Sequence, residues 1–249
     1  MKAIMTYHSI DPSGSVISVD EPTWRRHVEW YRSQHVQVVP LATLVTASAV
    51  DNAVAITFDD GFVNFRDCAW PLLKANGLPV TLFVPTDFVG AHNSWTASAS
   101  VRVPSLPIMD WDSLGQLAAD GVSIGSHTRR HPDLRTLSPT ALHDEIGGAA
   151  EELNRKLGKK PIEFAYPFGF VNPTVESVVR DHHTLACSTE LAILSERATP
   201  WRLPRLDAFY YRSPGHLERF GSSRFKSHLW IRSRARSLRH ALGRSAALA

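Results

Sequence analysis

The sequence has few cysteines and no long hydrophobic run, and each absence excludes a class of protein. Its two cysteines, Cys68 and Cys187, are too few for a disulfide framework or a four-thiolate metal site. We expect both to be small buried apolar residues. No apolar run reaches the roughly 18 to 20 residues that a membrane-spanning helix needs. The N-terminal residues also lack the apolar segment and small-residue cleavage site of a signal peptide, which predicts a reducing, cytoplasmic location.

Acidic and basic residues are unevenly distributed along the 249-residue chain. From His216 to the C-terminus there are eight basic residues and one acidic residue, Glu218, whereas residues 1–215 are slightly acidic in sum. The composition, 43% hydrophobic and 20% charged, is that of a globular protein long enough for one barrel-sized domain. We therefore predict one folded domain over residues 1–215 and a basic, helical C-terminal tail over residues 216–249.

Short apolar segments alternate with amphipathic segments along the first 190 residues. The apolar segments have the length of buried strands and lie at 3–7, 53–58, 79–85, 122–127, 162–166 and 184–187. Helical patterns lie between them, and the clearest begins at Ser138, an expected N-cap, with Pro139 in the first turn. This alternation predicts an α/β fold in which a parallel sheet is covered by helices.

Polar side chains follow the ends of four predicted strands. In chain order these residues are His8, Asp59, Asp60, His127, Tyr166 and Pro167. In α/β barrels the carboxyl ends of the parallel strands meet at one rim, and functional sites are built there. The sequence therefore predicts a site at the C-terminal rim of the strands.

Two motifs at this rim offer the residue types of a metal centre. Asp59 and Asp60 are adjacent on an extended segment, so their carboxylates point to opposite sides and can take different roles. One turn of helix would place His127 and His131 on one face, within reach of a common ion. Two imidazoles and one carboxylate are suitable ligands for Zn²⁺ or a similar divalent ion. Either motif alone is more often a turn or a solvated pair, and their shared location is what favours a metal site.

Four segments resemble the motifs of the polysaccharide deacetylases (carbohydrate esterase family 4). TFDDG at 57–61 is similar to the first motif of the family, and SHTRRH at 126–131 to the second. FAYPFG at 164–169 is similar to the third motif, in the form found in the poly-N-acetylglucosamine deacetylase branch. YHSI at 7–10 is similar to the N-terminal signature of that branch. The resemblance spans about residues 3 to 210.

The resemblance implies a distorted (β/α) barrel and metal-dependent removal of acetyl groups from N-acetylated sugars. The metal ligands of the family correspond to Asp60, His127 and His131. The general base corresponds to Asp59, which would take a proton from the attacking water. The oxyanion donor corresponds to the backbone N–H of Tyr166, next to Pro167 in the third motif.

The sequence departs from the family's pattern at two places. The Arg that steadies the catalytic Asp in the third motif is replaced by Ala165. Arg205 lies where this branch supplies an Arg later in the chain, and it would pair with Asp59 and keep it ionised; a surface loop position is the alternative. The Leu-x-x-His motif that provides the general acid has no clean copy. His216 is the only histidine near its expected place, and His8 is the alternative at the rim.

Several residues indicate what the protein binds. Trp95, and Trp111 with Asp112, could stack on sugar rings, although such tryptophans are more often anchors of the core or of loops.

In the tail an apolar stripe runs among arginines, which is typical of a basic helix lying on an anionic membrane surface. The stripe consists of Ile231, Ala235, Leu238 and Leu242. The alternative is a helix packed on the barrel with its arginines in water.

The sequence thus predicts a metal-dependent N-deacetylase, with Zn²⁺ as the expected ion. Its expected substrate is an N-acetylglucosamine-type residue in a bacterial exopolysaccharide or its lipid-linked precursor. One alternative is a saccharide-binding or assembly subunit with weak or no hydrolysis, and another is the same chemistry on a different small or lipid-linked amide. No nucleic-acid-binding motif accompanies the basic tail, so no such partner is expected. Nothing in the sequence specifies an oligomeric state.

Overall fold

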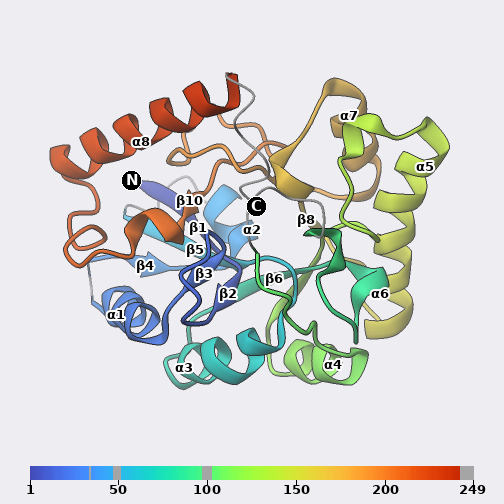
Figure 1. The fold of residues 1–249 in the computed structure, drawn as a ribbon, viewed down its shortest axis with the longest axis horizontal. Helices are drawn as coiled ribbons and strands as arrows, with labels where there is room; N and C mark the ends of the chain where they lie inside the picture. Colours follow the sequence, from blue (N-terminus) through green and yellow to red (C-terminus); the bar gives the residue numbers. More distant parts are fainter. Residues whose placement is uncertain (34, 47–51, 97–102, 242–249) are drawn as a thin grey trace.

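The computed structural model describes residues 1–33, 35–46, 52–96 and 103–241 (Figure 1). Within them, eight strands form one parallel sheet in the order β10-β1-β5-β6-β7-β8-β9, and β4 also pairs with β5. The strands of this sheet are β1 (Lys2–Tyr7), β4 (Gln37–Val38), β5 (Ala53–Phe58), β6 (Val80–Val84), β7 (Ser123–Ser126), β8 (Glu163–Ala165), β9 (Leu185–Cys187) and β10 (Leu206–Asp207). A separate parallel pair is formed by β2 (Ser9–Ile10) and β3 (Ser18–Val19).

The sheet is buried on both faces and curls toward closure. All six residues of β5 are buried, which explains why its sequence is almost continuously apolar. At the end of β9, Cys187 forms a parallel bridge to Leu203, and the chain then enters β10, which pairs with β1. The segment before β10 therefore brings the two ends of the sheet together, and the predicted α/β fold with a distorted barrel is confirmed.

Helices cover the outside of the sheet (Figure 1). They are α1 (Glu21–Arg32), α2 (Leu41–Thr46), α3 (Trp70–Ala75), α4 (Trp111–Ala119), α5 (Pro139–His143), α6 (Ala149–Leu157), α7 (Pro173–His182) and α8 (Ser223–Ala241). Ser138 is the N-cap of α5, as predicted, and its Oγ accepts a hydrogen bond from the Ala141 N–H at 3.3 Å. A π-helical segment, Asp144–Gly148, connects α5 directly to α6. No helix in the described residues is both long enough and apolar enough to span a membrane.

The basic tail forms α8, which packs on the barrel through an unexpected face. Phe225 and Leu229 are buried in the main hydrophobic cluster, together with residues of β1 and β5. The exposed large apolar side chains of α8 are Trp230, Ile231 and Leu238. The predicted apolar stripe is therefore not the packing face, and its last member, Leu242, lies outside the described residues. The helical prediction is confirmed over Ser223–Ala241, and this helix shares the core of residues 1–215.

Candidate metal and catalytic site

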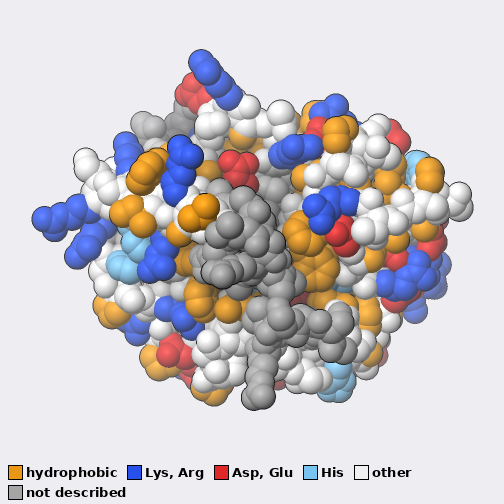
Figure 2. Space-filling model, turned by 45° about the horizontal axis from the view of Figure 1, so that its top comes forward, with side chains coloured by type: hydrophobic (Ala, Val, Ile, Leu, Met, Phe, Trp, Pro, Cys, Tyr) orange, Lys and Arg blue, Asp and Glu red, His pale blue; other side chains and the backbone are white. Residues whose placement is uncertain are grey.

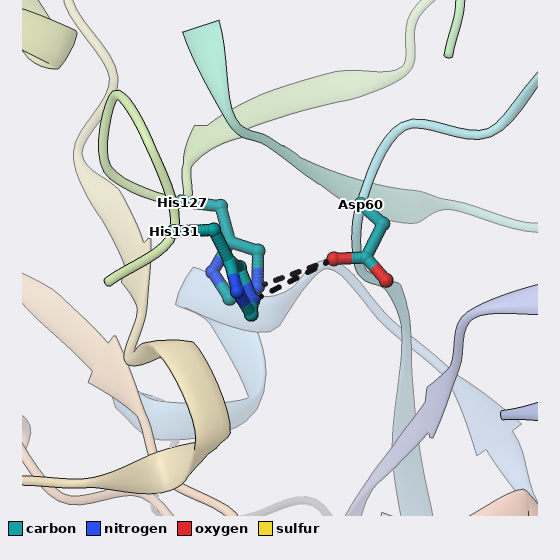
Figure 3. Close-up of side chains that lie close together, drawn as sticks. All are labelled: Asp60, His127 and His131. Atoms are coloured by element: carbon teal, nitrogen blue, oxygen red, sulfur yellow. Dashed lines mark ion pairs between the residues drawn. The ribbon is translucent and has the colours of Figure 1, made fainter. Parts of the chain in front are cut away.

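Asp60, His127 and His131 meet at the carboxyl ends of β5 and β7 (Figure 3). Asp60 Oδ1 lies 3.6 Å from His127 Nε2 and 3.8 Å from His131 Nε2. One ligand atom from each residue lies within 4.8 Å of the others, and all three residues are buried. The structure thus brings together the three side chains that the sequence predicts as metal ligands.

The electrostatic state of these side chains fits a divalent cation. His127 Nδ1 is 2.8 Å from the Ala165 carbonyl oxygen. Because a carbonyl can only accept, Nδ1 carries the proton and the Nε2 lone pair is free for a metal. Asp60 Oδ1 is buried and has no hydrogen-bond partner within the described part of the chain. Burial, and then the charge of Asp59, raise the pKa of Asp60 well above its ordinary value, so a bound cation would be needed to keep it ionised.

The segment that carries the two histidines is a loop, so the expected helical turn is wrong. Thr128 and His131 have φ angles of 68° and 54°, and this left-handed backbone turns the chain until both imidazoles face Asp60. The non-glycine residues with positive φ in the described part are Asn52, Asp60, Thr128, His131 and Phe168. All but Asn52 border the site, and such backbone strain concentrates where surrounding structure fixes a functional geometry.

The buried carboxylate of Glu145 holds this loop in place. Its Oε2 accepts hydrogen bonds from the backbone N–H groups of Arg129 at 3.0 Å and Arg130 at 2.9 Å. Its Oε1 accepts from Arg130 Nε at 2.6 Å. Glu145 therefore positions the loop that carries His131. The sequence does not reveal this role, because an acid inside a helical segment has the pattern of a solvent-exposed residue.

Arg205 forms a bidentate ion pair with Asp59 beside the three candidate metal ligands, as predicted. The two terminal nitrogens of Arg205 donate to the two carboxylate oxygens of Asp59, each at 2.7 Å. Arg205 Nε donates to the Ser188 carbonyl at 2.9 Å, which fixes the plane of the guanidinium. Burial alone raises the pKa of Asp59, but the charge and hydrogen bonds of Arg205 outweigh burial and hold that pKa well below its ordinary range. Asp59 is therefore ionised at neutral pH and available as a base.

His8 lies at the site and His216 does not. His8 Nε2 is 3.7 Å from Asp59 Oδ2. Burial lowers the pKa of His8 to about 4, although the charge of Asp59 opposes this shift. The ring of His216 instead lies 4.5 Å from that of His228 in α8. The prediction of His216 as the general acid is therefore contradicted, because the turn before it directs the chain toward α8.

The backbone N–H and the hydroxyl of Tyr166 each donate a hydrogen bond within the fold. Its N–H donates to the Cys187 carbonyl at 3.1 Å and thereby extends the pairing of β8 with β9. Its hydroxyl donates to the Trp201 carbonyl at 2.9 Å, and the side chain is fully buried. This geometry contradicts the prediction that the Tyr166 N–H is the oxyanion donor, because the sheet already uses it.

The next residues of the third motif form a tight turn against the site. Pro167 begins this turn, and the ring of Phe168 lies 4.6 Å from that of His131. Gly169 has a φ of 72°, and a Cβ atom there would lie 1.9 Å from Thr189 Oγ1, so only glycine fits. Phe168 is thus a site residue that we did not predict, although its place directly after Pro167 in the motif is a signal for it.

Of the tryptophans predicted to contact sugar, Trp95 lies at the site and Trp111 does not. The Trp95 indole stacks on the His131 imidazole, with centroids 4.7 Å apart and planes at 29°. Trp111 begins α4 and packs against the hydrophobic core, with Lys156 Nζ 5.5 Å from its ring. Trp111 therefore has the core-anchoring role that the sequence analysis gave as the alternative.

The family model described as polysaccharide deacetylase matches residues 47–186. The chain belongs to the polysaccharide deacetylase family. The matched region contains Asp59 and the three candidate metal ligands. His8 and Arg205 lie outside it, so this part of the site is built by segments beyond the family model.

Curated relatives carry related names at low identity. YxkH of Bacillus subtilis, a polysaccharide deacetylase by name, is 24% identical over 209 residues, which are 82% of this chain and 70% of the relative. A poly-β-1,6-N-acetyl-D-glucosamine N-deacetylase of Staphylococcus epidermidis is 22% identical over 77% of this chain and 70% of the relative. A chitin deacetylase of Pestalotiopsis is 30% identical, but the chain spans only 40% of its length.

Solved structures share the fold. The deacetylase PplD of Streptococcus pyogenes, in complex with acetate, has a TM-score of 0.69 and 20% identity over 82% of this chain and 91% of that one. IcaB from Ammonifex degensii has a TM-score of 0.67 and 20% identity over 87% of this chain and 94% of that one. These likenesses place the barrel, with its short parallel strands, among deacetylase structures.

Proposed function

We propose that this protein is a metal-dependent N-deacetylase of N-acetylhexosamine residues in a saccharide. The observation that carries the proposal is that two neighbouring carboxylates have pKa values shifted in opposite directions. Arg205 keeps Asp59 ionised, whereas Asp60 faces two imidazoles and needs a cation beside it. A base next to a metal centre is what hydrolysis of an unactivated amide requires.

Zn²⁺ is the ion that the ligand set favours, held by Asp60, His127 and His131. When bound, such an ion polarises the amide carbonyl and makes water more acidic. The chain's own residues then handle the protons. Asp59 takes a proton from the water that adds to the carbonyl carbon, and the bond from that carbon to nitrogen breaks to give acetate and a free amine.

His8 is the group we propose to protonate the leaving amine. Its Nε2 lies 3.7 Å from Asp59 Oδ2, close enough for a proton to pass with a small movement. The pKa of His8 is about 4, whereas the pKa of Asp59 is held well below its ordinary range. His8 can therefore receive the proton that Asp59 removes from water and deliver it to the amine.

The relatives support a polysaccharide as the substrate. The names poly-β-1,6-N-acetyl-D-glucosamine N-deacetylase and chitin deacetylase both describe polymers of N-acetylglucosamine. The partly exposed indole of Trp95, stacked on His131, gives this chain an aromatic surface beside the metal cluster. We propose an N-acetylglucosamine-type unit of a bacterial exopolysaccharide, or of its lipid-linked precursor, as the residue that is deacetylated.

Release of free amine from N-acetylglucosamine oligomers of increasing length tests this function. The zinc-loaded full chain is compared with Asp59→Asn, which keeps the shape of the side chain and removes the base. We expect kcat to fall by about 10²-fold or more, since a general base contributes that much, with zinc content per chain unchanged. Asp112→Asn, at the start of α4, is the matched control and should keep full activity. Removal of zinc by a chelator should abolish activity, and its return should restore it.

The alternatives predict different results in the same assay. If no oligomer releases amine while zinc remains bound, hydrolysis of these saccharides is excluded. Saturable binding of the oligomers would then support a saccharide-binding or assembly subunit, and the absence of binding would support an amide of another class. Equal activity of Asp59→Asn and the unmodified chain would exclude Asp59 as the base.

We also propose that α8 lies on an anionic membrane surface. The exposed large hydrophobic side chains in the described part of the chain are Ile162, Trp230, Ile231 and Leu238, and three of these four belong to α8. The guanidinium of Arg234 lies 5.6 Å from the Trp230 ring. Figure 2 shows basic and hydrophobic side chains together on the left of this face, where α8 lies. Apolar and basic side chains exposed on one helix are typical of a helix lying in the lipid interface, and this would place a cytoplasmic enzyme at the inner membrane.

A further inference from the structure

A cavity of about 480 Å³ adjoins the candidate catalytic site. Phe168 lines it, and the ring of Phe168 contacts the metal-ligand candidate His131 at 4.6 Å. Ser188 also lines it, and the carbonyl of Ser188 accepts the hydrogen bond from Arg205 Nε. Phe168 therefore separates the cavity from the candidate metal ligands, and Arg205 separates it from the proposed base. The volume of the cavity is sufficient for a sugar with a charged substituent.

Arg236 reaches this cavity from the inner face of α8. Its side chain is buried, with 6% of the residue exposed, on the same face as Phe225 and Leu229. Nη1 is 4.0 Å from Asp207 Oδ2, which is an ion pair without a hydrogen bond. Nη2 is buried and has no hydrogen-bond partner among the described residues. A buried guanidinium nitrogen without an acceptor is costly, and an anionic oxygen in the cavity would satisfy it.

The remaining charges that line the cavity also favour an anion. Arg135 and Arg202 line it beside Arg236, and Glu190 is the only acid among the described lining residues. Arg135 and Arg202 each have a carboxylate partner outside the lining, yet both side chains are more than 40% exposed and can turn toward a ligand. Guanidinium groups are well suited to phosphate and carboxylate, which accept two parallel hydrogen bonds.

We propose that this cavity binds an anionic substituent, a phosphate or a carboxylate, of the same saccharide whose acetyl group is removed at the neighbouring metal centre. The inference rests on the proposed deacetylase function and narrows its substrate class to acidic saccharides. A phosphate would come from a glycan still attached to its phosphorylated carrier. A carboxylate would come from a uronic acid within the glycan.

Three probes distinguish these sources, each tested with the zinc-loaded full chain in the absence of lipid. They are a neutral N-acetylglucosamine oligomer, the same oligomer with a phosphate at its reducing end, and the same oligomer ending in a uronic acid. We expect one charged probe to have a KM about tenfold lower than the neutral probe, since a hydrogen bond to a charged group contributes that much. Arg236→Gln should abolish this difference, and Arg236→Lys should retain part of it. Arg224→Gln, an exposed position on α8, should leave the difference unchanged.

Equal KM values would overturn the proposal if the probes are hydrolysed, and binding that is insensitive to Arg236→Gln would overturn it if they are not. If the neutral and charged probes have equal KM values, the cavity does not select anions, while the deacetylase function stands. If no probe is hydrolysed, the deacetylase function fails, and calorimetric binding of the same probes decides the question of the cavity. Tighter binding of a charged probe that Arg236→Gln removes would support the anion site, and binding insensitive to that substitution would exclude it. Thermal melting confirms that each variant is folded.

Discussion

Each oxygen of the Asp59 carboxylate accepts a 2.7 Å hydrogen bond from a different nitrogen of Arg205. This pair is buried, and its partners are 146 positions apart in the sequence. Parallel hydrogen bonds of this kind fix orientation as well as charge. The proposed base is thus oriented by a residue that the chain supplies only as the sheet nears closure, beyond the region matched by the family model.

Loss of this ion pair should alter both the pH profile and the stability. In Arg205→Met, burial of Asp59 is opposed only by the weaker effects of His8 and His127, so the pKa of Asp59 rises. Because the base must be ionised, the acid limb of kcat/KM should move to higher pH, and kcat at neutral pH should fall by about 10²-fold. The buried carboxylate left behind should lower the free energy of unfolding by about 3 to 5 kcal/mol. Arg205→Lys, which retains the charge, should show smaller changes, and an unmoved acid limb in Arg205→Met would contradict the role of the ion pair.

The two candidate acids should differ sharply in their effect on turnover. His8→Gln should lower kcat by about 10²-fold, as loss of a general acid does, with little change in KM or zinc content. His216→Gln should leave kcat unchanged, because its ring packs against His228 away from Asp59. Steady-state kinetics on an N-acetylglucosamine oligomer checks both variants. The reverse order of effects would restore the assignment of His216 as the acid.

A buried histidine outside the site should make the fold sensitive to mild acid. His27 Nε2 is 3.0 Å from the Tyr211 carbonyl oxygen, and Nδ1 is 2.8 Å from the Tyr7 hydroxyl. Burial lowers its pKa from 6.5 to about 4, so the folded protein keeps it neutral. Between these two pH values the unfolded chain binds a proton at His27 and the folded chain does not. The contribution of neutral His27 to the free energy of unfolding is therefore full above pH 6.5 and is lost as the pH falls toward 4.

This sensitivity can be measured by urea unfolding at several pH values. The free energy of unfolding should decrease by up to about 1.4 kcal/mol for each pH unit below 6.5 from this one group. His27→Gln should show a shallower decrease over the same interval. His35→Gln is the matched control, because His35 is exposed, and its curve should parallel that of the unmodified protein. A parallel curve for His27→Gln would show that another group causes the acid sensitivity.

Membrane association is best tested by single substitutions on the outer face of α8. Removal of residues 220–249 would also remove Phe225 and Leu229 from the core, so it would confuse binding with unfolding. Ile231→Asp should weaken sedimentation with phosphatidylglycerol-containing vesicles by about tenfold or more, since burial of one such side chain contributes that much. Ile162→Asp, at an exposed apolar residue elsewhere, should have no effect. Equal sedimentation of both variants would argue against the lipid-facing role.

The strands and the metal cluster were predictable because their signals are local. The apolar runs at 53–58 and 79–85 each end in a turn, and both form central strands of the sheet. The spacing of His127 and His131 indicated a shared ion, but the helical turn expected between them is absent. Positive φ angles at Thr128 and His131 depend on tertiary contacts, including the hydrogen bonds that the intervening backbone N–H groups donate to Glu145, and no local pattern encodes these contacts.

The predictions that failed concern contacts between distant segments. The destination of the Tyr166 N–H is decided by the register between β8 and β9, which the motif alone does not specify. The inner face of α8 was misjudged because Phe225 and Leu229 begin the helix, ahead of the more regular stripe from Ile231 to Leu238. That buried face includes Arg236, an arginine that composition alone would assign to solvent.

The late position of Arg205 has a consequence during synthesis of the chain. A chain that has been synthesised only as far as His131 contains the proposed base, Asp59, and all the proposed metal ligands, but it does not yet contain the arginine that orients the base. Only when the segment around Leu203 joins β9, and β10 joins β1, does the guanidinium reach the carboxylate. Closure of the sheet by β10 and orientation of the proposed base by Arg205 are therefore the same event.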